Sequence, residues 1–372
     1  MKFSILSLVL LIGIFNKIRG DAEVCDDSVC TIDNNCRCAS VNGPLALEDT
    51  PQLVVLAFVD AATQDLYKNV WGPLVEPRKN PDGEFISATF YLPHEYTDYQ
   101  IVHDLAVFGF EIAAHSVTNN PHQEYWRNAN ESLLESEFGD QKKIIAKFAN
   151  IPESAVKGTL VPQLVLAGDS SITAFVKQGF VYDNSWTSKT SLYPYTLDYA
   201  SDQNCDTGSN CPKESHPGFW IAPIIDLIAG DGDVCATIAA CFRDSNTQTA
   251  QEISDWLVNQ IQTVKNSNRA PLTLIIEDNL FKSVNESWAG LNDALDRIQE
   301  DKEIFLVSQS RVIEWMKNPT PLSEFKTAAE TVDTGCVKNT CALKNPSGDE
   351  RYMVSCVPCP QNYPWLGNPE GQ

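Results

Sequence analysis

The chain has 372 residues, and its 27 basic and 49 acidic side chains give a formal net charge of −22 at pH 7. Such a negative surface repels nucleic acid and anionic membranes, so neither is expected as a partner. Twelve cysteines, an even number, indicate a disulfide-bonded protein of an oxidising compartment. The length allows one large domain of α/β-barrel size as readily as two smaller domains.

The start of the chain predicts secretion. Lys2 precedes an apolar run at 3–15, which is the layout of a signal peptide, and we expect cleavage near Gly20. The run is too short to span a bilayer comfortably, and no later segment reaches about 18 consecutive apolar residues. Two "NES" sequons predict glycosylated surface positions at Asn130 and Asn285. The mature protein is therefore expected to be secreted, extracellular and soluble.

The cysteines crowd both ends of the chain and form two close pairs in the middle. Four lie near the start and four near the end, which predicts stapled extensions at 21–50 and 331–372 whose disulfide connectivity the sequence does not fix. Zinc ligation by "CRC" and "CVPC" is the alternative for these groups. Each of the two close pairs is expected to form a disulfide that closes a short loop. The pairs are Cys205 with Cys211 and Cys235 with Cys241.

Between the extensions, from about residue 51 to 330, strand-like and helix-like segments alternate. Apolar residues recur at spacings of three and four between the strands, as in amphipathic helices. Buried strands separated by helices indicate a parallel sheet, so we predict an α/β fold, a distorted (β/α) barrel of about seven parallel strands. The irregular stretch 187–250 is expected to be an insertion over one face. The predicted strands are 53–61, 88–93, 110–116, 156–162, 180–186, 271–278 and 303–309.

Polar residues follow several of these strands. In parallel barrels the functional residues lie at the carboxyl ends of the strands, so these positions predict a cleft. One of them, unexpectedly, is a leucine. In chain order they are Asp60, His115, Asn119, Leu160, Pro162, Asp183, Asn184, Trp186, Glu277 and Asp278.

Five ordered blocks, "AFVDA", "HSVTN", "LVPQ", "VYDNSW" and "LIIEDNLF", resemble the motifs of the polysaccharide deacetylases. The phrases "RKNPDGEFISATFYLPHEYTDY" and "KFANIPESAVKG" extend the resemblance to the insect chitin deacetylases, over about residues 50–318. Among these, the chain is similar to the short members without separate chitin-binding modules, a form typical of the gut. The resemblance implies a barrel fold and metal-dependent hydrolysis of the N-acetyl group of chitin.

The metal site that the resemblance implies is incomplete. The family blocks TFDDA and HSxTH supply one aspartate and two histidines, and this chain has Asp60, His115 and Asn119 at those positions. An amide oxygen is a weak ligand for zinc, so zinc is expected to be weakly bound or absent. His122 is an alternative second ligand. Without metal, His115 would be a hydrogen-bonded residue at a strand end.

The residues that move protons in the family are also replaced. Val59 stands at the position of the base and cannot accept a proton, which removes a contribution of about 10²–10⁴ in rate. Leu160 stands where the family has the arginine that orients that base, and the two apolar residues are mutually consistent. Glu277 replaces the histidine that protonates the departing amine, and a carboxylic acid with a raised pKa could serve there. With Asp60 and Asp183 it also permits a glycosidase interpretation.

These replacements predict a protein that binds chitin, a β-1,4-linked N-acetylglucosamine polymer, without deacetylating it. A deacetylase with an altered site and a crosslinker of an extracellular matrix such as the gut lining are the alternatives. A monomer with one groove cannot crosslink by itself, and we expect a monomer. Pro162 and Asp183 are expected to contact substrate. The aromatic residues expected to stack on sugar are Tyr182, Trp186, Tyr193 and Trp220, with Trp126 as a further candidate.

Overall fold

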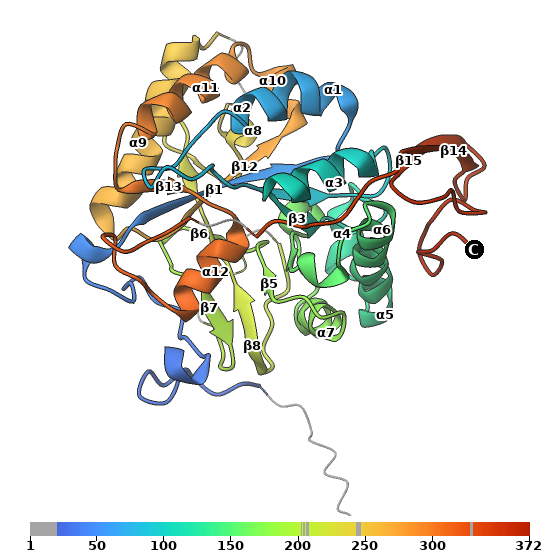
Figure 1. Cartoon of the computed structure of the whole chain (residues 1–372). Coiled ribbons are helices and arrows are strands. Elements are labelled where there is room, and N and C mark those ends of the chain that lie inside the picture. Colours follow the sequence, from blue (N-terminus) through green and yellow to red (C-terminus); the bar gives the residue numbers. More distant parts are fainter. Residues whose placement is uncertain (1–20, 202, 204, 206–207, 243–246, 328–329) are drawn as a thin grey trace, which may run out of the picture.

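The structure is a computed structural model of the chain (Figure 1). The predicted signal peptide, residues 1–20, lies outside the described residues. Within them, no helix combines the length and apolar character needed to cross a membrane. The described residues are 21–201, 203, 205, 208–242, 247–327 and 330–372.

A nine-stranded, mostly parallel sheet forms the centre of the molecule. Its strands follow the order β12-β1-β2-β3-β4-β5-β8-β7, and β13 pairs with the first half of β1. In this sheet, as far as the chain is described, β7 and β8 are the one antiparallel pair. This arrangement confirms the predicted distorted barrel. The strands are β1 (Gln52–Val59), β2 (Thr89–Leu92), β3 (Glu111–Ala114), β4 (Gly158–Thr159), β5 (Tyr182–Asp183), β7 (Tyr195–Leu197), β8 (His216–Ile221), β12 (Leu272–Glu277) and β13 (Ile304–Leu306).

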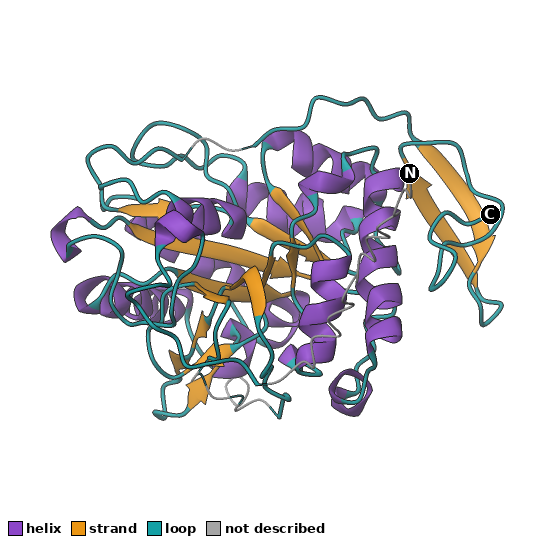
Figure 2. Ribbon diagram, turned by 90° about the horizontal axis from the view of Figure 1, so that it is seen from below, coloured by secondary structure: helices purple, strands orange, loops and turns teal. Residues whose placement is uncertain are grey.

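Helices pack around the sheet and bury its strands (Figure 2). All eight residues of β1 are buried, as expected for a central parallel strand covered on both faces. The longest helix, α9, begins with a capping box formed by Thr249 and Glu252. The helices are α1 (Gln64–Leu66), α2 (Gly72–Val75), α3 (Tyr99–Phe108), α4 (Gln123–Arg127), α5 (Glu131–Leu134), α6 (Asp140–Phe148), α7 (Asp169–Lys177), α8 (Ile238–Cys241), α9 (Ala250–Ser267), α10 (Asp278–Ser283), α11 (Ser287–Ile298) and α12 (Gln309–Lys317).

The insertion at 187–250 is more regular than the sequence predicted. Two of its strands, β7 and β8, join the central sheet beside β5. Pro217 and Gly218 in "HPGFWI" weaken the strand pattern of β8, although Trp220 pairs in register with Tyr182 of β5. The insertion also contains two short strand pairs. These are β6 (Thr187–Ser188) with β9 (Ile224–Ile225), and β10 (Leu227–Ile228) with β11 (Val234–Cys235).

All twelve cysteines form disulfides, and every bridge is local. The two close pairs in the middle of the chain are bonded as predicted. The alternative of zinc ligation by "CRC" and "CVPC" is wrong, because their sulfurs are consumed in disulfides. The C-terminal extension forms the hairpin β14 (Asn339–Lys344) and β15 (Glu350–Ser355), which contacts α3 (Figure 1). The bridges are Cys25–Cys38, Cys30–Cys36, Cys205–Cys211, Cys235–Cys241, Cys336–Cys356 and Cys341–Cys359.

Candidate functional site

The parallel sheet brings the predicted site positions to one edge. Val59, the last residue of β1, pairs in register with Glu277, the last residue of β12. Asp60 follows directly. On the other side of β2, His115 follows β3 and Leu160 follows β4, and these two strands are neighbours. The carboxyl edge of the sheet therefore collects the residues that the sequence singled out.

The positions of the base and its arginine are apolar and packed. Val59 is 7% exposed and Leu160 is 2% exposed. The backbone N–H of Leu160 donates to the carbonyl of Ala114 at 3.1 Å, which continues the pairing of β3 with β4. Neither side chain can accept or donate a proton. The edge thus has no general base at the place where the resemblance puts one.

Asp60 and Glu277 are carboxyl groups in partly buried surroundings. The Oδ2 atom of Asp60 accepts a hydrogen bond from the backbone N–H of Asp278 at 2.6 Å, at the start of α10. Burial raises the pKa of Asp60 to about 6, and this hydrogen bond opposes the rise. Burial also raises the pKa of Glu277, against a hydrogen bond from Thr237 in the insertion. Thr237 forms a bridge with Ile275 of β12, so the insertion covers this end of the edge.

His115 is buried and neutral. Its Nδ1 atom lies 2.7 Å from the carbonyl oxygen of Leu160. Because a carbonyl only accepts, Nδ1 carries the proton and Nε2 carries the lone pair. Burial lowers the pKa of His115 to about 4. Metal-binding histidines use this arrangement, in which a backbone carbonyl fixes the tautomer.

Asn119 lies in a loop that a buried glutamate holds in place. Its φ of 44° is left-handed, a conformation that asparagine tolerates better than most residues. The fully buried carboxylate of Glu137 accepts hydrogen bonds from the backbone N–H groups of Val117 and Thr118, at 3.1 and 3.0 Å. The hydroxyl groups of Thr118 and Tyr125 donate to the same carboxylate. The sequence did not single out Glu137, because no local pattern links it to a loop about twenty residues earlier.

The donor set at the carboxyl edge does not fit a tightly held zinc ion. Asp60 and His115 offer a carboxylate and a neutral imidazole, both good zinc ligands. The third position, Asn119, offers a neutral amide, which prefers hard cations. His122 is exposed at the N-cap of α4. Two strong protein ligands are one fewer than catalytic zinc sites use.

A second group of potential metal ligands lies at the starts of α7 and β8. The side-chain donors of Asp169, Glu214 and His216 lie within 4.8 Å of one another. The Nε2 atom of His216 is 3.1 Å from Oδ1 of Asp169. Asp169 also accepts hydrogen bonds from the backbone N–H groups of Lys213 and Glu214. Two carboxylates and an imidazole could hold a divalent cation, so measurements of metal content have to separate this group from Asp60 and His115.

The aromatic rings expected to stack on sugar are part of the core. Each of them is at most 1% exposed, and a ring without an accessible face cannot stack on a sugar. The expectation is therefore wrong for this conformation of the protein, because these large aromatic side chains pack into the core and remove their apolar area from water. The buried rings are Trp126, Tyr182, Trp186, Tyr193 and Trp220.

Pro162 and Asp183 are buried as well. The carboxylate of Asp183 accepts hydrogen bonds from Thr159 Oγ1 at 2.9 Å, Ser185 Oγ at 2.8 Å and Ser185 N at 2.9 Å. Burial raises the pKa of Asp183 to about 6, while these hydrogen bonds oppose the rise. Asp183 thus ties the end of β4 to the end of β5, a structural role rather than contact with substrate.

Tyr96 is an exposed ring at the carboxyl edge that the sequence did not single out. It is 66% exposed in the loop that follows β2. This loop lies against the loop after β1, since the N–H of Asp98 donates to the carbonyl of Ala62 at 2.8 Å and Gln64 Nε2 donates to Asp98 at 2.8 Å. The guanidinium of Arg351 lies 5.0 Å from the ring centroid. Its exposure, which no sequence pattern indicated, makes Tyr96 a candidate for contact with a ligand.

Both predicted glycosylation sites lie at the surface. Asn130 and Asn285 are exposed. The side-chain oxygen of Asn130 accepts a hydrogen bond from the N–H of Leu133 at 2.9 Å and so caps α5. The predicted exposure is confirmed, and glycosylation itself stays a prediction.

Comparison with known proteins finds relatives along nearly the whole chain. No model of a known protein family matches it. Chitin deacetylase 8 of Bombyx mori is 33% identical over 364 residues, which cover 94% of this chain and 94% of that protein. Chitin deacetylase 1 of Bombyx mori is 30% identical over 379 residues, which cover 94% of this chain and 69% of that protein. The solved structure of Puue allantoinase has a TM-score of 0.50 at 10% identity, covers 72% of this chain and 92% of that chain, and shows a similar fold alone.

Proposed function

Because this chain belongs to the chitin deacetylase family of the polysaccharide deacetylases, we propose that it binds chitin or a related N-acetylglucosamine polymer without deacetylating it. The observation that carries the proposal is the packed valine at the position of the base. Val59 ends β1 beside Asp60 and opposite Glu277, and no proton acceptor stands in its place. Without an activated water, the N-acetyl group is not hydrolysed at an appreciable rate.

The carboxyl edge supplies the proposed binding surface. The exposed ring of Tyr96 offers an apolar face of the kind that sugars stack on, and it lies in a loop packed against the loop after Asp60. Asp60 and Glu277 offer hydrogen-bond acceptors at the ends of β1 and β12, along the same edge of the sheet. The local disulfides and the predicted leader support a secreted, extracellular protein in which the barrel at 51–330 carries the binding surface.

Sedimentation with insoluble chitin tests the proposal. The purified mature protein should sediment with chitin, and Tyr96→Ala should weaken this binding by about tenfold, as expected when an exposed aromatic contact is lost. Phe85→Ala is the matched control, because Phe85 is also exposed but precedes β2, on the amino side of the sheet. If the wild-type protein does not sediment with chitin, the proposed function is wrong.

A deacetylase with an altered site is the second candidate, favoured by the tautomer of His115 and by the carboxyl group of Asp60 at the same edge of the sheet. It requires acetate release from a chitin oligomer that stops on chelation. We expect no acetate above the level of a heat-inactivated sample. If metal is retained after dialysis, Asp60→Asn and His216→Gln will show which group of ligands holds it. Size-exclusion chromatography with light scattering should give a monomer, whereas a dimer would favour the matrix crosslinker.

A further inference from the structure

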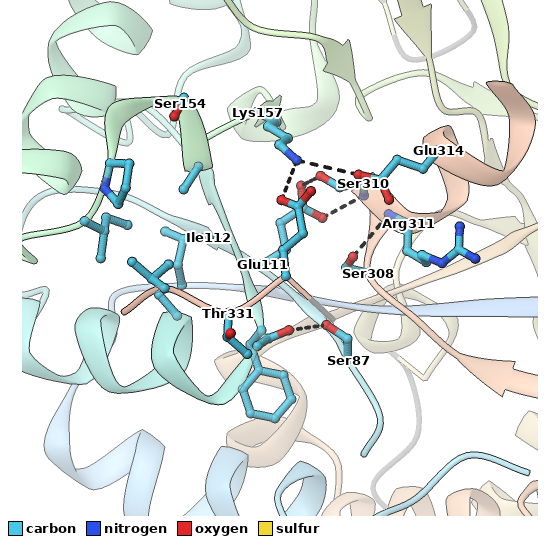
Figure 3. A pocket seen from close by; sticks show the side chains of 18 of the residues that line it. Ser87, Glu111, Ile112, Ser154, Lys157, Ser308, Ser310, Arg311, Glu314 and Thr331 are labelled. Carbon is cyan, nitrogen blue, oxygen red and sulfur yellow. Dashed lines mark hydrogen bonds and ion pairs between the residues drawn. The ribbon is translucent and has the colours of Figure 1, made fainter. Parts of the chain in front are cut away.

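A cavity of about 600 Å³ lies at the amino edge of the sheet, away from the site positions described above (Figure 3). Glu111 opens β3 and lines this cavity, whereas His115 follows the other end of the same strand. In the same way, Lys157 precedes β4 and Leu160 follows it. The cavity is therefore separate from the positions that the family uses, at the opposite ends of the same two strands.

The carboxylate of Glu111 forms the floor on the polar side of the cavity, and hydrogen bonds fix it in place. Glu111 accepts hydrogen bonds from Thr89 Oγ1 at 2.9 Å, Tyr182 OH at 2.8 Å and the backbone N–H of Ser310 at 2.8 Å. The Ser310 hydroxyl donates to it as well. Four donated hydrogen bonds therefore hold the carboxylate of Glu111 in one position on the floor of the cavity.

Two further carboxyl groups share one lysine above this floor. The Nζ atom of Lys157 lies 2.6 Å from Glu330 and 3.6 Å from Glu314. Its tight partner is Glu330, and Glu314 is held more loosely. Burial raises the pKa of Glu314, the neighbouring carboxyl group of Glu330 adds to the rise, and the positive charges of Lys157 and Arg311 oppose it.

The other basic residue at the cavity, Arg311, attracts Glu314 from a distance, and among the described residues no ion pair joins it to the acids of the lining. Arg311 donates from Nε and Nη2 to the carbonyl of Lys326, at 3.1 and 2.7 Å, and its guanidinium lies 4.8 Å from the ring centroid of Phe325. Figure 3 shows its side chain pointing away from Lys157 and Glu111. Asp333 adds another acid to the lining. The charged groups of the cavity are therefore four acids against two bases.

The opposite wall is apolar. It comes from the end of α3, the start of β3, the segment before β4 and the segment after Glu330, so it is built from four separate parts of the described chain. A cavity of this size matches a small organic ligand, and an acidic wall facing an apolar one selects for an amphipathic cation. The apolar residues include Phe110, Ile112, Ile151, Pro152, Ala155 and Val332.

We propose that this cavity is a binding site for a small organic cation, in which Glu314 and Glu330 receive a protonated amine and the wall around Ile112 receives its apolar body. The loosely paired Glu314 is the residue that gains most from the ligand. An anion of the same shape would meet four acids. The site does not depend on the chitin-binding proposal, since it lies at the other edge of the sheet.

Titration calorimetry on the mature protein, with its disulfides intact, tests this proposal with three probes that share a phenyl body. Phenethylamine should bind at one site per chain, and 2-phenylethanol and 3-phenylpropionate should bind at least about tenfold more weakly. Equal binding of all three probes would mean that the cavity binds the phenyl group without discriminating between charges, and it would overturn the proposal. Absence of phenethylamine binding at millimolar concentration would overturn it too.

Glu314→Gln locates the binding. Its side chain is 43% exposed, so the variant should fold. The variant should weaken the binding of phenethylamine by about tenfold and leave the weak binding of 2-phenylethanol unchanged. Glu350→Gln, at an exposed position of β15, is the matched control and should bind like the wild type. If Glu314→Gln binds the amine as tightly as the control does, the amine is not held at this wall and the proposal fails.

Discussion

Val59 and Leu160 stand where the family resemblance places an aspartate and an arginine, so they define the simplest test of lost catalysis. The triple variant Val59→Asp, Asn119→His and Leu160→Arg restores the base, its partner and the second histidine. We expect acetate release from a chitin oligomer to rise from background, with the base alone worth about 10²–10⁴ in rate. The signal should disappear on chelation.

Val59→Asp alone is the control for that restoration. It places a carboxylate beside Asp60 and Glu277 without a positive partner, so we expect a less stable protein and no acetate release. A triple variant that folds, binds zinc and still releases no acetate would mean that Glu277 or the covering insertion also blocks the reaction.

Glu137 is the residue on which the loop from His115 to Asn119 depends. Glu137→Ala leaves the backbone N–H of Thr118 and the hydroxyl groups of Thr118 and Tyr125 without their acceptor, whereas the N–H of Val117 keeps the backbone carbonyl of residue 137. Each buried group left unsatisfied costs about 1–3 kcal/mol. The urea midpoint should fall accordingly. Glu124→Ala, at an exposed position on α4, should change the free energy of unfolding by less than about 1 kcal/mol. Equal midpoints for the two variants would contradict this role of Glu137.

His94 makes stability depend on pH. Burial lowers its pKa to about 3, from 6.5, and its Nδ1 lies 2.6 Å from the hydroxyl of Tyr99. Between these two pKa values the unfolded chain binds a proton that the folded chain excludes. The free energy of unfolding therefore falls as the pH decreases below 6.5, by about 2 kcal/mol at pH 5 from this residue.

Urea titrations of the wild type and of His94→Gln at pH 7.5 and 5 check the sign of this dependence. The variant should lose less stability than the wild type between the two pH values. The pKa of Asp183 is raised to about 6, so this residue makes the folded protein more stable as the pH decreases. Asp183 is present in both proteins, so its contribution cancels in the comparison. An equal loss in the two proteins would remove His94 as the cause.

At the scale of the elements, the seven strands that the sequence predicted are all present, because runs such as "LVVLAFV" and "LTLII" are apolar on both faces. β8 was missed because Pro217 and Gly218 hide a strand that is specified by pairing with β5. The positions at the carboxyl edge were predictable, since order along the chain fixes which strand ends carry them. Tyr96 and Glu137 were not, because exposure and long-range hydrogen bonds leave no local pattern.

The helix α8 and its disulfide cover the end of β12. The double variant Cys235→Ser and Cys241→Ser should speed hydrogen exchange at 234–242 and at the end of β12, where Thr237 contacts Glu277. The double variant Cys341→Ser and Cys359→Ser is the matched control and should speed exchange in β14 and β15 alone. Faster hydrogen exchange in β14 and β15 of the Cys235→Ser and Cys241→Ser variant would mean that this hairpin and the region around α8 are coupled.

At the scale of the whole molecule, charge is the property with the widest effect. A net charge of −22 makes the folded chain repel itself, and salt screens this repulsion. We expect the thermal midpoint to rise between low and moderate concentrations of sodium chloride. A midpoint that falls with salt would indicate that ion pairs, such as that of Lys157 with Glu330, outweigh the net repulsion.

The six disulfides also constrain how the chain can be made. Their cysteines are separated by 6, 6, 6, 13, 18 and 20 residues. Each pair therefore emerges within a short stretch of synthesis, and the choice of partner is confined to a few cysteines of the same segment. Completion of the sheet, by contrast, requires β1 to pair with β12 and β13, which lie more than two hundred residues later in the chain. Oxidation and barrel closure are thus separable events, because every disulfide can form within its own short segment before the sheet closes.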